Sequence, residues 1–301
     1  MSRNTGVSAI PSLLDNCTSV QISTGHKSSE YSVVRKPGLT SNGGIEGSFP
    51  IYDTSSHGVG EKKPLSTKDL SKLGKEREIA RVHIKCSSRN KRDFDVNVVA
   101  ANGTVVAQFK RSAGPSLFEN RGQAVEMPVK VAILQEGREA PRFGEGTVEM
   151  KEIGSCTFNV SGHPRLTVYG DSLSGDDAVT SFEMTRPFCN FHSTMCCLGF
   201  LLFLPTFGIA TCVSIGCSLK KPLKYDMQKT RSGGKSIDLS PLLVRGTDTH
   251  IDFNDLSLAN GGVITPQVIA SDKFSMLMYA IITACENVVE PPSNNSGGSS
   301  L

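Results

Sequence analysis

The 301-residue sequence contains no tryptophan, and aromatic residues make up only 6% of it. Charged residues account for 20% and hydrophobic residues for 38%, a balance that excludes a chain disordered throughout and a polytopic membrane protein. The N-terminus lacks the apolar run of about seven or more residues that a signal peptide needs. The nine cysteines show no pairing by spacing, so we expect the cytosol or its membranes rather than secretion.

Enzyme motifs are also missing from the chain. No serine lies in a Gly-x-Ser-x-Gly elbow, and the acidic residues form no pair suited to acid–base catalysis. Gly233-Gly-Lys-Ser236 resembles the end of a phosphate-binding loop but lacks its first glycine and the apolar strand before it. No histidine has a partner at zinc-ligand spacing. We therefore predict a non-enzymatic protein without catalytic residues.

Basic residues are concentrated between residues 61 and 92, where eleven Lys/Arg stand against four Asp/Glu, a net charge of +7 in a chain of +3. Such a run attracts anionic partners over long range, unless it is merely a solvated linker face. It contains no aromatic residue before Phe94 on which bases could stack, so an anionic phospholipid membrane is favoured over nucleic acid. The candidate lipid-binding residues are Lys62, Lys63, Lys85, Arg89, Lys91 and Arg92.

The first 60 residues contain 12 Ser, 5 Thr and 8 Gly, with apolar residues scattered among them. Such a segment buries too little apolar surface to offset the entropy of ordering it, so residues 1–60 are predicted to be disordered. Residues 61–78 are predicted to be a basic linker with a short helix over 66–73 that Gly74 ends. Residues 291–301 are predicted to be a disordered tail.

From residue 79 onward, apolar and polar residues alternate with the period of a β-strand. Strands are expected over 79–86, 94–98 and 105–109, and Asn102-Gly103 between the last two is typical of a type I′ hairpin turn. Further strands are expected around 129–133, 148–150, 156–160, 166–168 and 179–184. Many short strands at such spacing indicate an antiparallel sandwich or barrel.

Residues 271–289 show helical periodicity, with Ser271 as a plausible N-cap and Asp272 in the first turn. Both faces of this helix are apolar, so it must be buried in protein or lipid. The charge-free stretch between Lys273 and Glu286 is about 18–20 Å long, which is too short for a bilayer core of about 30 Å. Burial inside protein is therefore expected.

Residues 195–219 are uncharged and mostly apolar. Three structures remain open for them: a membrane-spanning helix, a pair of buried strands broken at Pro205, or a shallow hairpin in the membrane interface. Cys196 and Cys197 are candidates for palmitoylation beside such a segment, or else are small buried residues.

Thr185-Arg-Pro-Phe-Cys189, followed by Cys196-Cys197, resembles a stretch of the phospholipid scramblases. Cys212 to Cys217, Leu223 to Met227 and the terminal apolar helix follow in an order similar to the C-terminal half of that family. The resemblance implies the fold shared with tubby-like and LURP-one-related proteins, a twelve-stranded antiparallel β-barrel closed around one hydrophobic helix. We assign residues 79–290 to this barrel, including the segment 195–219.

The resemblance also implies a calcium site just before the helix, on Asp248, Asp252, Asn254 and Asp255, whose oxygen atoms suit a hard cation. A solvated acidic loop is the alternative. The resulting prediction is a mainly β, membrane-associated protein on the cytoplasmic face that binds or moves phospholipids. The rival prediction is a single-pass membrane protein, spanning at about 195–219, whose β-rich domain binds a protein partner.

Overall fold

The structure of the protein is a computed structural model that describes part of the chain. The described residues are 7–8, 13–25, 30–34, 44–56, 64–86, 94–111, 125–134, 142–144, 149–158, 164–169, 179–185, 223–232, 234, 236–239, 242–245, 248–253, 256 and 266–289.

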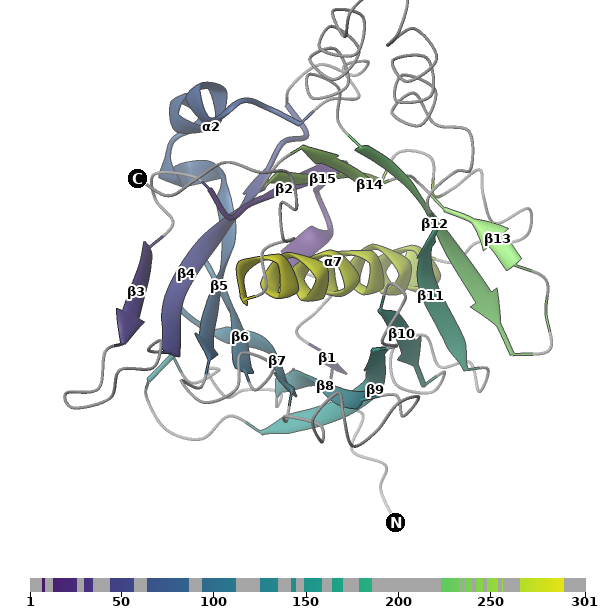
Figure 1. Ribbon diagram of the computed structural model, residues 1–301. Helices are drawn as coiled ribbons and strands as arrows, with labels where there is room; N and C mark the ends of the chain where they lie inside the picture. The colour runs from purple at the N-terminus through teal and green to yellow at the C-terminus, as the bar shows by residue number, and fades with distance from the viewer. Residues whose placement is uncertain are drawn as a thin grey trace, which may run out of the picture.

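The protein is mainly β, with a closed antiparallel barrel around one C-terminal helix, as the sequence predicts (Figure 1). The twelve strands of the closed ring are β2 (Ser19–Ser23), β4 (Gly44–Asp53), β5 (Glu78–Cys86), β6 (Phe94–Ala100), β7 (Val105–Arg111), β8 (Val125–Leu134), β9 (Met150–Phe158), β10 (Arg165–Val168), β11 (Thr180–Thr185), β12 (Leu223–Arg231), β14 (Leu242–Arg245) and β15 (Asp248–Asp252). Three strands pair outside the ring: β1 (Val7–Ser8) with β8, β3 (Glu30–Val34) with β4, and β13 (Ser236–Asp238) with β12. The helical elements are α2 (Thr67–Leu73), the 3-10 turn η1 (Lys75–Arg77) and α7 (Pro266–Val289).

The ring is an up-and-down meander in which each strand pairs with the next ring strand along the chain. The first ring strand, β2, closes it by pairing with the last strand, β15, on one side and with β4 on the other. Because every pair is antiparallel, the strands alternate in direction. One end of the barrel, which we call the Cys86 end, is where β5 stops at Cys86, and the other, the Glu78 end, is where β5 begins.

Helix α7 passes through the middle of the ring (Figure 1). Its residues from Phe274 to Ile282 are 1% exposed or less, and they pack with the inward side chains of the strands in a single hydrophobic core. This arrangement explains why the helix is apolar on every face, and it confirms the expectation of burial inside protein. The helix begins five residues earlier than predicted, so Ser271 lies inside it rather than at its N-cap.

The predicted hairpin at Asn102-Gly103 is confirmed, but its loop has three residues rather than two. The backbone N–H of Ala100 donates to the carbonyl of Thr104, which leaves Ala101 to Gly103 as the loop. Gly103 has φ +87°, a value that favours glycine, and the Asn102 side chain accepts a hydrogen bond from the Thr104 N–H. The type I′ prediction is therefore wrong, while the strands it joins are correct.

Gly154 marks a second place where the fold requires glycine. A Cβ atom at this position of β9 would lie 2.1 Å from the carbonyl oxygen of Thr167 on β10. Such a distance is shorter than any real contact, so β10 can approach β9 only because the side chain is absent.

The prediction that residues 1–60 are disordered is wrong for two ring strands, β2 and β4. Val20, Ile22, Phe49 and Ile51 are fully buried in the core. The barrel therefore begins at least 60 residues before the predicted boundary at residue 79. Residues 291–301 lie outside the described part of the chain.

Candidate membrane-binding site

The candidate lipid-binding residues do not form one surface. Lys85 is exposed near the last residue of β5, where its strand neighbours are Glu46 and Asp95. Arg89, Lys91 and Arg92 lie outside the described residues, in the segment that leaves the barrel at Cys86 and returns at Phe94. Lys62 and Lys63, also outside them, precede Pro64 on the way to the opposite end of β5. Nine residues of strand, about 26 Å, thus separate the two halves of the basic run.

The part of the predicted linker that is described, residues 64–77, packs against the outside of the barrel, and we call it the strap. The Gln21 side chain of β2 donates to the Leu65 carbonyl at 3.0 Å and accepts from the Leu65 N–H at 2.7 Å. Leu70 on α2 is 1% exposed. The strap therefore belongs to the folded domain, and the prediction of a linker over 61–78 is wrong for these residues.

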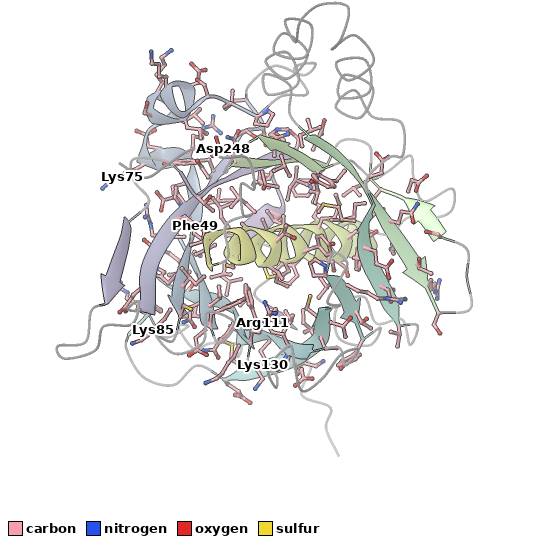
Figure 2. The ribbon with its side chains drawn as sticks, viewed as in Figure 1. Phe49, Lys75, Lys85, Arg111, Lys130 and Asp248 are labelled. Carbon is pink, nitrogen blue, oxygen red and sulfur yellow. The ribbon has the colours of Figure 1, made fainter. Side chains whose placement is uncertain are left out.

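The predicted short helix in this segment is confirmed as α2. The Ser66 side chain caps it by accepting from the Asp69 N–H, and Gly74, with φ +74°, ends it. Lys68, Lys72 and Lys75 on the strap are exposed. Figure 2 shows Lys75 and Lys85 on the outside of the barrel; Lys75 lies on η1, just before β5 begins, and Lys85 lies near the end of β5.

The apolar segment 195–219 and the palmitoylation candidates Cys196 and Cys197 lie outside the described residues. The chain that carries them leaves the barrel after Thr185 and returns at Leu223. Among the helices that the structure describes, none is long and apolar enough to cross a membrane. The four described cysteines, Cys17, Cys86, Cys156 and Cys285, form no disulfide with one another, and all four are buried.

Two of the four predicted calcium ligands, Asp248 and Asp252, are described. They are the first and last residues of β15, so their Cα atoms are about 13 Å apart along an extended strand. Asp248 instead accepts a hydrogen bond from Ser23 at 2.5 Å. Asn254 and Asp255 are outside the described residues, among which no group of three or more His, Cys, Asp or Glu is placed to hold a metal. The predicted site as a set of four therefore stays a prediction.

Sequence reasoning missed the polar side chains that fix α7 inside the barrel. Lys229 on β12 donates to both carboxylate oxygens of Asp272 on α7, at 2.7 and 2.8 Å, and both side chains are largely buried. Tyr279 donates from its hydroxyl to the Pro164 carbonyl at 2.7 Å and accepts from the Met184 N–H at 3.2 Å. The sequence carries one signal of this arrangement: Asp272 and Lys273 are charged, and the helix that follows them is uncharged from Phe274 to Cys285.

Lys273 ties the helix to the N-terminal turn that lies at the Glu78 end. Its Nζ donates to the carbonyl of Cys17 at 2.8 Å and lies 5.6 Å from the centre of the Phe253 ring. Burial, together with the nearby Asp53 carboxylate, raises the pKa of Cys17 to about 11. This thiol therefore stays protonated at neutral pH and has the character of a structural residue rather than a nucleophile.

His250 is a buried histidine on the outer face of β15, between Leu243 of β14 and Gln21 of β2. Its Nδ1 atom is buried and makes no hydrogen bond with the described residues. Burial lowers the pKa of His250, and the Asp252 carboxylate opposes that shift.

Comparison with known proteins identifies no relative: no family model, no curated protein and no solved structure matches this chain significantly.

Proposed function

We propose that this protein is a non-enzymatic, membrane-associated barrel that binds anionic phospholipids on the cytoplasmic face of a membrane. The observation that carries the proposal is the fold. A ring of twelve antiparallel strands around one apolar helix is the architecture implied by the resemblance to scramblases and tubby-like proteins. That resemblance rests on residues 185–227 and on α7, whereas the ring also includes β2 and β4, which had no part in it.

The filled interior directs the search for a lipid site to the outside of the barrel. Side chains of α7 and of the strands form one continuous core, with Phe49, Phe109 and Phe182 from the wall and Phe274 from the helix all 1% exposed or less. A phospholipid would therefore be bound by the connections between strands or by the outer surface.

Two kinds of anchor support stable attachment. Basic residues near an anionic membrane contribute about 1 kcal/mol each, which gives Lys85, Arg89, Lys91 and Arg92 a weak, salt-sensitive attraction. Stable anchoring needs a second signal, and we assign that role to the apolar segment 195–219 with palmitoylation at Cys196 and Cys197.

Co-sedimentation with lipid vesicles tests the proposal. The full chain should sediment with phosphatidylcholine vesicles that contain phosphatidylserine and should bind pure phosphatidylcholine vesicles at least tenfold more weakly. Added salt should weaken the binding because the charge contribution is screened. Equal binding to both kinds of vesicle, or to neither, would refute the proposal.

Lipid transport and calcium dependence are separate parts of the proposal and need a separate measurement. We expect the protein, reconstituted into vesicles with a labelled phospholipid, to speed movement of the label between leaflets, and addition of calcium measures any dependence on that ion. A rate equal to that of protein-free vesicles would refute transport while leaving lipid binding intact.

A single-pass membrane protein with a protein-binding barrel is the second candidate, favoured by the 25 uncharged residues of 195–219. Membrane fractionation of cells that express a Cys196→Ser, Cys197→Ser variant distinguishes the two. Retention of the variant after carbonate extraction supports the spanning protein, and its release supports the lipid-anchored barrel.

A further inference from the structure

Strand β4 pairs with two different strands along one of its edges. Its residues 51–53 pair with β2, and its residues 44–48 pair with β3. Both partners are antiparallel to β4, so β2 and β3 are successive parts of one interrupted strand. On its other edge β4 pairs with β5, from Glu46 opposite Lys85 onward. β3 is therefore the third strand of a continuous sheet in the order β5–β4–β3.

The ring of the barrel turns away before it reaches β3. β15 begins at Asp248, opposite Ser23, which is the last residue of β2. Asp248 also pairs with Arg245, the last residue of β14, so the chain reverses there and does not continue along β3. Among the strands that the structure describes, β4 is the only one that pairs with β3. Figure 1 shows β3 as the outermost strand of this sheet, with β4 between it and β5.

The second edge of β3 has the properties of a docking edge. An unpaired edge presents peptide N–H and C=O groups that can pair with another strand. Alternate residues direct both groups to the same side, so the five residues of β3 direct about two or three sets away from β4. Short length, lysine and proline are the usual means of protecting an edge, and Glu30–Val34 contains neither lysine nor proline. The other described strands outside the ring, β1 and β13, have only two and three residues.

We propose that two copies of this protein associate through their β3 strands, which pair antiparallel about a two-fold axis at Ser32. The strand is complementary to itself in this register. Glu30 of one copy stands opposite Val34 of the second copy, and Tyr31 stands opposite Val33, so the acidic residue never opposes its own counterpart. A parallel arrangement would place Glu30 opposite Glu30, and like charges in that position are destabilising.

The two-fold axis also limits the assembly to a dimer. The same edge serves both copies, so their pairing uses both β3 edges and leaves neither for a third copy. The resulting sheet runs β5–β4–β3 through one copy and continues as β3–β4–β5 through the other. Since a single pair of short strands makes a small contact, the dimer should dissociate reversibly on dilution. This inference does not depend on lipid binding, and either can fail without the other.

Analytical ultracentrifugation of the full chain tests the association. We expect the mass to rise from that of a monomer to that of a dimer as the protein concentration increases. A monomer at every concentration would overturn the proposal.

Charges introduced at Ser32 test the register. Ser32→Lys places two positive charges opposite each other on the two-fold axis, and Ser32→Glu places two negative charges there. Each variant alone should dimerise at least tenfold more weakly than the unmodified protein. A mixture of the two should recover the dimer, because Lys then opposes Glu, and added salt should weaken this mixed dimer.

Ser236→Lys is the matched control, since it makes the same substitution at an exposed position of β13, the other short strand that pairs with a ring strand near the surface. It should dimerise as the unmodified protein does. Loss of the dimer in this control, or an undiminished dimer in Ser32→Lys, would assign the contact to another surface and overturn the proposal. A mixture of Ser32→Lys and Ser32→Glu that stays monomeric, with both variants folded by far-UV circular dichroism, would also overturn it.

Discussion

The hydroxyl of Tyr279 joins α7 to two strands of the wall inside the core. Replacing it by Tyr279→Phe leaves the Pro164 carbonyl and the Met184 N–H without this partner in a buried place. We expect a loss of about 1–3 kcal/mol in the free energy of unfolding, measured by urea denaturation. Tyr169→Phe is the control, because this side chain is 38% exposed, and its effect should stay within about 0.5 kcal/mol. Equal effects of the two changes would contradict the assignment.

His250 makes the stability of the barrel depend on pH. Burial lowers its pKa in the folded protein below the usual 6.5, so the unfolded chain binds the proton more readily. The neutral His250 side chain therefore makes its full contribution to the free energy of unfolding above pH 6.5. That contribution declines as the pH falls from 6.5 toward the lower pKa of the folded state. This one residue can change the free energy of unfolding by at most about 1.4 kcal/mol per pH unit.

Comparison of variants isolates this contribution from that of the acidic residues. Between pH 7 and pH 5, a range that includes the ordinary histidine pKa, the His250→Leu protein should lose less stability than the unmodified protein. His83→Leu serves as the control because His83 is only half-buried, on the same outer surface and stacked on Phe143. Parallel pH profiles for the unmodified protein and His250→Leu would show that His250 does not carry the effect.

At the scale of elements, the largely buried pair of Lys229 and Asp272 joins α7 to β12. Removing one partner leaves the other charge buried, so Asp272→Asn should cost about 3–5 kcal/mol in the free energy of unfolding. The double variant Lys229→Met, Asp272→Leu removes both charges and should recover most of that loss. Urea denaturation of the single and double variants measures the difference, and a double variant as unstable as Asp272→Asn would contradict the explanation.

The elements that the sequence predicts well are those with strong local patterns. β5, β6 and β7 alternate clearly, and α7 is uncharged and mostly apolar from Phe274 to Cys285. β2 and β4 were missed because their local signals point away from a strand. β2 has only five residues, three of them polar, and those polar residues are buried against neighbours distant in sequence. β4 contains Pro50, which is rare in central strands, at the level where its partner changes from β2 to β3.

The candidate site was predicted only in part for a similar reason. Lys62 and Arg92 are close in sequence, but a strand as long as β5 takes the chain from one end of the barrel to the other between them. Asp248 and Asp252 were grouped by their spacing, which an extended strand converts into separation. Local spacing therefore identifies the residue types at a site, while only the topology shows which of them meet.

At the scale of the whole molecule, closure of the ring depends on the pairing of β2 with β15, more than 220 residues apart in the chain. Contacts this distant form late, because the entropy of closing the loop must be overcome before they contribute. We therefore expect slow folding, in which the other strands pair with their sequence neighbours before β2 enters between β4 and β15.

Removal of residues 1–25 tests whether the N-terminal part completes the barrel. If it were a disordered tail, the truncated protein would unfold at the same urea concentration as the full chain. Since β2 supplies Val20 and Ile22 to the core and fills the gap between β4 and β15, we expect the truncated protein to lose its cooperative unfolding transition. Val20→Asp keeps the chain length and should be strongly destabilising for the same reason, because it buries an unpaired carboxylate. A cooperative transition at the unchanged urea midpoint in either variant would show that the ring closes without β2.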